Sequence, residues 1–292
     1  MTADWRELYP FGSHTLPIGS WQYHYVDEGS GEPLLLVHGN PTWSFYWRNL
    51  ILAFRDRYRV VAPDHMGCGW SDKPQAYPYC LSTHIANLVH LIEALDLRAA
   101  TLLVHDWGGA IGLGAALRVP DRIARLILFN TGAFPPPSIP WRIRLGRTPW
   151  LGAWAIRGLN LFVRGALRMT VQKRERMTPQ VRAGLLAPYD SWEHRVAIHR
   201  FVADIPADPR HPTWQVLEEI EAGLPSLADR PVQLIWGMRD WCFPPECLER
   251  FLKVFPDAEV HRLSDAAHYV VEDAYEQIIP WVEAFLRAHP VR

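Results

Sequence analysis

One stretch of the sequence, residues 100–117, restricts the possible folds more than any other. A run of β-forming residues from Ala100 to Val104 leads to Asp106, and two glycines and a small apolar run follow at once. This order is typical of a strand that turns sharply into a helix and holds one side chain out at the bend. We therefore expect Asp106 to lie at the carboxyl end of a strand.

The side chain at this bend decides the chemistry. Serine hydrolases carry Ser there, whereas this chain carries Asp106. A carboxylate is ionised near pH 7 and attacks carbon without the help of a base, giving an ester that water must then hydrolyse. Taken alone, Asp106 is equally consistent with an N-cap, which stabilises a helix by about 1 kcal/mol.

The composition is that of an ordinary globular protein. The 292 residues are 49% hydrophobic and 21% charged, which suffices for a substantial core. A formal net charge of −1 gives no reason to expect nucleic acid or a membrane surface as a partner. No apolar run approaches the roughly 18 residues of a membrane span, and the polar N-terminus has no signal-peptide pattern. The four cysteines predict reduced thiols in a cytoplasmic protein.

Strand-like and helix-like segments alternate along most of the chain, which predicts a mostly parallel sheet with helices on both faces. The rhythm breaks at Gly132, where a proline-rich stretch begins, and residues 141–223 contain helix-like segments and no convincing buried strand. We therefore expect an α/β fold of the α/β-hydrolase type, doubly wound, with an inserted helical cap. The predicted boundaries are 1–133 and 227–292 for the core and 134–226 for the cap.

Three residues fall at the carboxyl ends of predicted strands in the order Asp106, Asp240, His268. Nucleophile, acid and histidine follow each other in this order in the α/β-hydrolase triad. Asp106 would attack carbon, Asp240 would orient His268, and His268 would take a proton from water. The backbone N–H groups of Asn40 and Trp107 are the natural donors to the oxyanion, although the loop around Asn40 alone resembles a plain turn.

No cofactor or metal is expected. The glycine-rich loop 63–74 lacks the spacing and the Gly-Lys-Ser/Thr sequence of a phosphate-binding loop. Cys242 and Cys247 have no second cysteine or histidine pair at zinc spacing.

Three motifs, at residues 38–43, 63–74 and 105–109, resemble the haloalkane dehalogenase family, and the likeness covers nearly the whole chain. The resemblance implies that the side-chain amide of Asn40 and the indole N–H of Trp107 bind the departing halide. It also implies hydrolytic cleavage of a carbon–halogen bond in a small apolar substrate, which we take as the first prediction of function.

Position 130 restricts which branch of the family the chain resembles. A large branch of that family takes its acid from the end of the strand before the cap, where this chain carries Asn130. An amide cannot act as the acid, so the chain resembles the third dehalogenase subfamily, with Asp240 in that role. It also resembles the β-lactone decarboxylases of long-chain olefin biosynthesis, both at these residues and in the cap stretches 187–192 and 200–206. The decarboxylase is therefore the alternative prediction.

Two further alternatives stay open. Epoxide hydrolases share the Asp elbow but use cap tyrosines, and Tyr189 is the only tyrosine in the cap region. A non-catalytic α/β-hydrolase-fold binding protein would have no need of the complete triad. The sequence leaves open whether the chain forms a homo-oligomer. It predicts an apolar pocket in the cap. The predicted pocket-lining residues are Phe134, Trp141, Tyr189 and Trp192.

Overall fold

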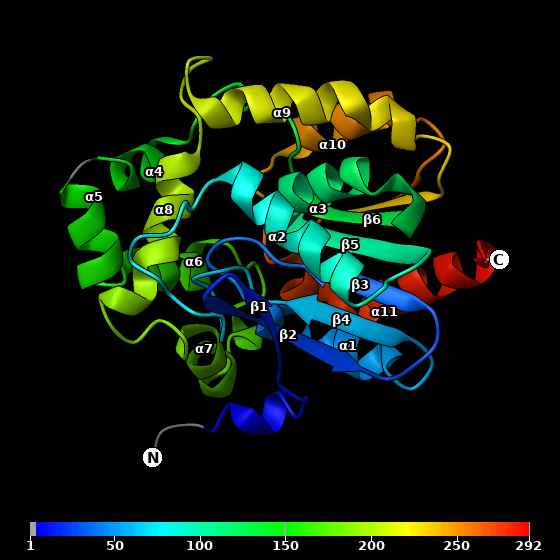
Figure 1. Cartoon of the computed structure of the whole chain (residues 1–292), viewed down its shortest axis with the longest axis horizontal. Coiled ribbons are helices and arrows are strands. Elements are labelled where there is room, and N and C mark those ends of the chain that lie inside the picture. Colours follow the sequence, from blue (N-terminus) through cyan, green and yellow to red (C-terminus); the bar gives the residue numbers. More distant parts are fainter. Residues whose placement is uncertain (1–3, 149, 292) are drawn as a thin grey trace.

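The computed structural model describes residues 4–148 and 150–291, and it is built around one eight-stranded sheet (Figure 1). The strands are arranged in the order β1-β2-β4-β3-β5-β6-β7-β8. β1 and β2 pair antiparallel, and β2 joins β4 antiparallel, whereas the strands from β4 to β8 in this order are all parallel. The strands are β1 His14–Ile18, β2 Trp21–Glu28, β3 Pro33–Val37, β4 Arg59–Pro63, β5 Ala100–Asp106, β6 Ile123–Thr131, β7 Val232–Gly237 and β8 Glu259–Leu263.

Helices cover both faces of this sheet. α2 and α3 pack together in front of it in Figure 1, whereas α11 runs behind it and contacts α1. Every residue of β5 is buried, so this central strand needs helices on both faces of the sheet. The helices of the core are α1 Arg48–Phe54, α2 Leu81–Ala94, α3 Trp107–Arg118, α10 Pro245–Val254 and α11 Val270–Ala288, with short 3₁₀ turns at Arg6–Leu8, Ser44–Trp47 and Pro120–Arg122.

The segment between β6 and β7 is helical, and none of its described residues forms a strand. Its helices gather at one end of the sheet, on the left of Figure 1, with the longest, α9, along the top. The helices are α4 Trp141–Gly146, α5 Leu151–Ala153, the π-helical turn η4 Trp154–Gly158, α6 Leu161–Met169, η5 Arg174–Arg176, α7 Pro179–Leu186, η6 Glu193–Arg195, α8 Val196–Asp204, α9 Pro212–Gly223 and η7 Leu224–Leu227.

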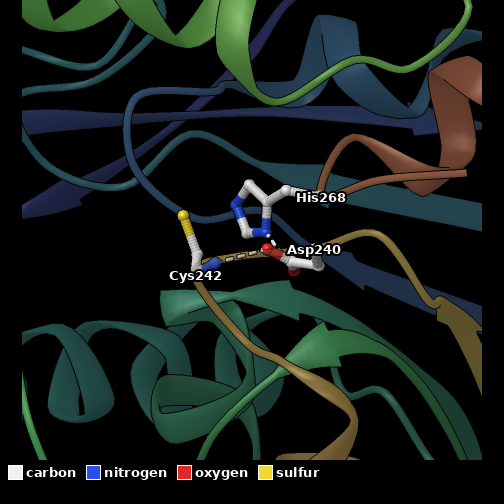
Figure 2. A group of neighbouring side chains, drawn as sticks. All are labelled: Asp240, Cys242 and His268. Atoms are coloured by element: carbon white, nitrogen blue, oxygen red, sulfur yellow. Dashed lines mark hydrogen bonds and ion pairs between the residues drawn. The ribbon is translucent and has the colours of Figure 1, made fainter. Parts of the chain in front are cut away.

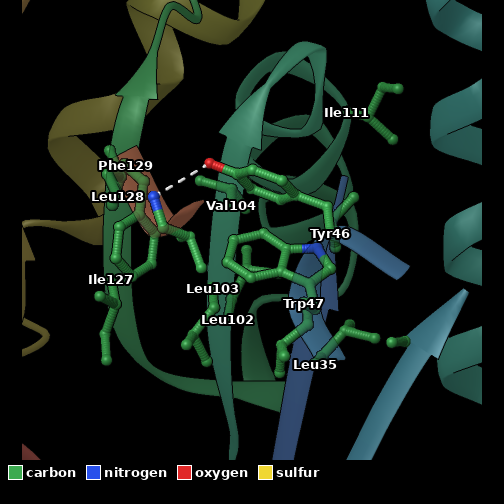
Figure 3. Packing of buried hydrophobic residues seen from close by; sticks show 14 of the residues in the cluster. Leu35, Tyr46, Trp47, Leu102, Leu103, Val104, Ile111, Ile127, Leu128 and Phe129 are labelled. Atoms are coloured by element: carbon green, nitrogen blue, oxygen red, sulfur yellow. Dashed lines mark hydrogen bonds between the residues drawn. The ribbon is translucent and has the colours of Figure 1, made fainter. Parts of the chain in front are cut away.

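Large aromatic side chains fill the core next to the central strands. Figure 3 shows Tyr46 and Trp47 packed against residues of β5, with β6 beside them. Both aromatic side chains are fully buried, and the backbone N–H of Val271 donates to the Tyr46 hydroxyl at 3.3 Å. This packing ties the first turn after β3 to the start of α11, so the loops that leave the carboxyl edge of the sheet have fixed starting points.

The predicted α/β-hydrolase fold is confirmed, with two differences in detail. β1 was not expected, because its five residues are mostly exposed and include Pro17. The amphipathic pattern of the sequence predicts a last helix from Tyr275 to Ala288, whereas α11 begins five residues earlier, at Val270. Within the part of the chain that the structure describes, no helix is long and apolar enough to cross a bilayer.

Candidate active site

Asp106 lies at the last position of β5, where the chain turns into α3. Its backbone has φ 55° and ψ −130°, a conformation that residues with a Cβ rarely adopt. The Thr131 hydroxyl donates to the carbonyl oxygen of Asp106 and holds the bend from the neighbouring strand. The strained turn presents the carboxylate at the carboxyl edge of the sheet, as the sequence pattern predicts.

Two glycines make room for this bend. A Cβ on Gly39 would collide with the side chain of Asp106, and a Cβ on Gly108 would collide with the Val37 carbonyl. The loop after β3 and the first turn of α3 therefore approach each other more closely than larger residues allow. This approach brings the backbone of Asn40 to the nucleophile.

Backbone donors surround the Asp106 carboxylate. The N–H of Asn40 donates to Oδ1 at 2.7 Å, and the N–H of Trp107 also donates to the carboxylate. Burial alone would raise the pKa of Asp106, but the hydrogen bond and charge of His268, together with these donors, hold it below its usual value. The carboxylate is therefore ionised across the physiological range, the state that a nucleophile requires.

His268 lies between two carboxylates. Its Nδ1 is 2.8 Å from Oδ2 of Asp240, and its Nε2 is 3.2 Å from Oδ2 of Asp106. Burial alone would lower the pKa of His268, but the charges and hydrogen bonds of Asp240 and Asp106 outweigh it and raise the pKa to about 10. The structure thus brings the three predicted triad residues together, with the imidazole protonated at neutral pH.

Asp240 is held by neighbours on both of its oxygens. The N–H of Cys242 donates to Oδ1 at 2.6 Å (Figure 2). The side-chain amide of Asn130 donates to Oδ2 at 3.0 Å. Asn130 is itself fixed, because it exchanges hydrogen bonds with both the N–H and the carbonyl of Gly237. Asn130, the residue that occupies the alternative acid position, therefore orients the acid in the loop after β7.

Asp240, Cys242 and His268 form a group that could offer ligands to a metal ion, since their ligand atoms lie within 4.8 Å of one another. Figure 2 shows that Asp240 and His268 already face each other through a hydrogen bond. Burial, followed by the charges of Asp240 and Asp106, raises the pKa of the Cys242 thiol, so the thiolate that a metal needs is disfavoured. The ion pair between Asp240 and His268 is sufficient to explain why these two side chains are close.

The side chains of Asn40 and Trp107 both line the cavity in front of Asp106. The Asn40 amide donates one hydrogen to the Ile198 carbonyl at 3.3 Å, which leaves its second hydrogen free for a bound anion. The indole of Trp107 packs against Phe201 with ring centroids 5.6 Å apart, and its N–H has no hydrogen-bond partner among the described residues. Two neutral donors are thus available beside the nucleophile.

The cavity has a volume of about 370 Å³ and lies between the carboxyl edge of the sheet and the helical segment. Phe134 lines it, as predicted, and so does the proline-rich stretch that follows, which the sequence identified only as a break in the fold. The wall is mostly apolar. Further apolar lining residues are Ile139, Ile143, Phe162, Val202, Leu217 and Phe243.

The other three predicted lining residues are not part of the cavity wall, and this corrects the sequence interpretation. Trp141 is 66% exposed and Trp192 is 41% exposed. Ile143, two positions after Trp141, faces the cavity instead, because residues two apart on a helix lie on nearly opposite sides. Tyr189 is buried elsewhere, and its hydroxyl donates to the Thr42 carbonyl at 3.2 Å.

Sequence reasoning also missed residues that position the histidine. The ring of Phe243 stacks on His268, with centroids 5.7 Å apart. The buried carboxylate of Asp273 accepts hydrogen bonds from the N–H groups of Ala267, at 2.9 Å, and Lys173, at 2.8 Å. A single sequence does not indicate these roles. Phe243 merely follows the predicted acid, and Asp273 is one of several acidic residues near the start of a helix.

Comparisons with known proteins identify relatives of this sequence and fold. The model of the alpha/beta hydrolase fold family matches residues 32–159. A cis-3-alkyl-4-alkyloxetan-2-one decarboxylase of Shewanella oneidensis is 41% identical over 285 residues, which cover 96% of this chain and 89% of that protein. Haloalkane dehalogenase 2 of Mycobacterium bovis is 34% identical over 93% of this chain and 94% of its own length. The crystal structure of haloalkane dehalogenase DatA from Agrobacterium tumefaciens superposes with a TM-score of 0.85 at 27% identity, covering 95% of this chain and 96% of that one.

Fold and sequence together define an enzyme family built on the α/β-hydrolase fold. Within that superfamily the chain belongs to the haloalkane dehalogenase family, close to the cis-3-alkyl-4-alkyloxetan-2-one decarboxylases.

Proposed function

We propose that the protein is a β-lactone decarboxylase that converts a cis-3,4-dialkyl-oxetan-2-one into a cis-olefin and carbon dioxide. The observation that carries the proposal is the identity of 41% with a decarboxylase over 96% of the chain, against 34% with a dehalogenase over 93%. Our first prediction from the sequence, hydrolytic dehalogenation, thereby becomes the second candidate, and the decarboxylase becomes the first.

In the proposed first step, Asp106 attacks C4 of the lactone ring, the carbon that carries the ring oxygen. The C4–O bond of the ring breaks while a C4–O bond to Asp106 forms, with inversion at C4. Opening releases the strain of the four-membered ring. Attack at carbon needs an ionised carboxylate and no base, which agrees with the lowered pKa of Asp106. The released group is a carboxylate that stays in the same molecule on C3.

In the proposed second step, the covalent adduct fragments. The bond from C3 to the carboxylate carbon breaks, its electrons form the C3=C4 double bond, and Asp106 leaves C4 with the electrons of the C–O bond. Inversion followed by elimination from opposite sides converts a cis-lactone into a cis-olefin. Atoms and charge balance without water, cofactor or external proton.

The charge state of His268 suits this second step. Before the reaction a pKa of about 10 keeps the imidazole protonated at neutral pH, between Asp106 and Asp240, and the carboxylate released in the first step retains the negative charge that Asp106 gives up. The cation faces Asp106 Oδ2 and stabilises the carboxylate that departs from C4. Hydrolysis would require the neutral imidazole as a base, so His268 would first have to lose its proton.

Asn40 and Trp107 would bind the carboxylate released in the first step. Their side chains line the cavity beside Asp106, and two neutral donors stabilise an anion without neutralising the nucleophile. The apolar wall suits alkyl substituents and excludes water, which strengthens these electrostatic contacts.

Dehalogenation remains the second candidate, because the same donors suit a departing halide and a dehalogenase shares the fold with a TM-score of 0.85. Alkylation of Asp106 would remove one of the two negative charges that face His268. The pKa of His268 would then fall, and the neutral imidazole could activate water.

A comparison of substrates tests the proposal. The purified protein is given a cis-β-lactone with two long alkyl groups and, in a parallel assay, 1-bromobutane. We expect olefin and carbon dioxide from the lactone at a kcat/KM at least 100-fold above that of bromide release. The Asp106→Asn variant serves as the inactive control in both assays. Rapid bromide release without olefin formation would reject the decarboxylase and favour the dehalogenase.

A further inference from the structure

The helices between β6 and β7 expose an unusual number of large apolar side chains. Trp150 is 90% exposed and Trp141 is 66% exposed, although such residues are normally buried. Large exposed apolar patches mark sites where a protein or a membrane binds. We define the cap face as the following exposed residues: Trp141, Leu145, Trp150, Leu151, Trp154, Leu159, Leu161, Met169 and Trp192.

These residues form one continuous surface. α4 contacts α5, and η4 contacts α5, α6, α8 and η6. Gly158 lies between two of the tryptophans, since a Cβ there would be 3.5 Å from Trp154 and 3.7 Å from Trp192. Figure 1 shows α4 and α5 at one end of the molecule, opposite the end of the chain at α11.

The same surface carries a strong positive charge that the total charge of the chain conceals. Residues 134–174 contain eight basic residues and no acidic residue, whereas the whole chain has a formal net charge of −1. Within the described part of the chain, none of the seven arginines of this segment forms an ion pair, whereas Lys173 pairs with Asp265. The arginines are Arg142, Arg144, Arg147, Arg157, Arg164, Arg168 and Arg174.

We propose that the cap face docks on the surface of an anionic lipid bilayer. Tryptophan side chains favour the interface between water and lipid, and arginines bind phosphate groups with paired hydrogen bonds. Anionic lipids attract clustered basic residues, each of which contributes about fivefold in affinity. A second copy of the chain docked face to face would set positive charge against positive charge, so the charge pattern favours lipid over a symmetric dimer.

The cap face also adjoins the cavity. α4 places Trp141 on the outside and Ile143 in the cavity wall. The guanidinium of Arg142 lies over the rings of both Trp141 and Trp241, at 5.3 and 5.4 Å, and Trp241 lines the cavity. The cap face and the cavity wall therefore share one helix, α4. Docking itself does not depend on which reaction the site performs.

Sedimentation with vesicles tests this proposal without any turnover. The protein is mixed with vesicles of 70% phosphatidylcholine and 30% phosphatidylglycerol, or of phosphatidylcholine alone, in buffer of low salt. We expect binding to the anionic vesicles, weak binding to the neutral ones, and release at high salt. The triple variant Arg144→Glu, Arg164→Glu, Arg168→Glu should bind about 100-fold more weakly.

A matched control reverses three exposed arginines of the core, Arg98, Arg262 and Arg287, with the same change of net charge. This control should keep most of its vesicle affinity, and Asp106→Asn should bind like the parent protein. Equal losses in the two triple variants would overturn the proposal, because they would reflect total charge alone. So would a stable dimer without vesicle binding, disrupted by the cap variant in analytical ultracentrifugation, since a second copy would then cover the face.

Discussion

At the scale of single residues, the site is a balance of three charges. His268 bears a positive charge between the negative charges of Asp106 and Asp240, and all three side chains are buried. A buried charge is stable only when it is paired and hydrogen-bonded. Asn130 and the N–H of Cys242 donate hydrogen bonds to Asp240 and hold its carboxylate in place.

Replacing Asp240 with Asn removes this charge and keeps the shape. We expect turnover of the lactone to fall by about 10²- to 10³-fold, because His268 loses the charge partner that keeps it cationic beside the departing Asp106 carboxylate. The pKa of His268 should also fall, because Asp240 is the largest of the causes that raise it. Assay of the proposed lactone gives the first result, and thermal unfolding between pH 7 and 10 gives the second.

The direction of the expected change in stability with pH follows from the linkage between folding and the protonation of His268. The pKa of His268 is about 10 in the folded protein and about 6.5 in an unfolded chain. Its contribution to stability is therefore complete below pH 6.5 and is lost as the pH rises through 10. Tm should fall more steeply over this range in the parent protein than in Asp240→Asn. Parallel Tm profiles and unchanged turnover would show that the acid lies elsewhere.

At the scale of elements, Asp273 joins the histidine loop to the cap. Its carboxylate, in the first turn of α11, accepts hydrogen bonds from the N–H groups of Gln172 and Lys173 in the cap. It also accepts one from the N–H of Ala267, next to the histidine. The N–H of Tyr269 donates to the Thr170 carbonyl across the same joint, at 2.8 Å. The position of His268 thus depends on how the cap sits on the sheet.

The Asp273→Asn variant should loosen this joint, because the amide would direct its NH₂ group at backbone donors. We expect the free energy of unfolding to fall by about 2 kcal/mol and kcat to fall by about 10- to 100-fold, with little change in KM. The control Asp265→Asn breaks only an exposed ion pair with Lys173 in the same loop and should leave both quantities nearly unchanged. An effect on KM alone would contradict the positioning role.

Some elements could be predicted from the sequence and others could not, for physical reasons. β5 and β7 consist mostly of apolar residues, a pattern that indicates strands buried on both faces. Trp141 was assigned to the wrong side, because α4 has only six residues and carries large apolar side chains on both of its faces. The role of Asn130 depends on the distance between β6 and β7, which one sequence does not contain.

At the scale of the whole molecule, charge and polarity are distributed unevenly. The near-neutral total led us to expect no membrane-surface partner, yet the cap face is basic and apolar. The cavity beneath it is lined mainly by apolar residues, with Asp106 at the carboxyl edge of the sheet and the charged residues Glu246 and Arg250 on α10. This arrangement suits an apolar substrate that presents one reactive polar group to Asp106.

The central claim is that the adduct on Asp106 fragments and is not hydrolysed. Many turnovers of a cis-β-lactone in H₂¹⁸O test it directly, with mass analysis of the products and of the peptide that contains Asp106. If the adduct fragments, the product is cis-olefin and the Asp106 carboxylate stays unlabelled, because no water attacks it. A β-hydroxy acid as the product, with ¹⁸O incorporated into Asp106, would show that water resolves the ester and would contradict the claim.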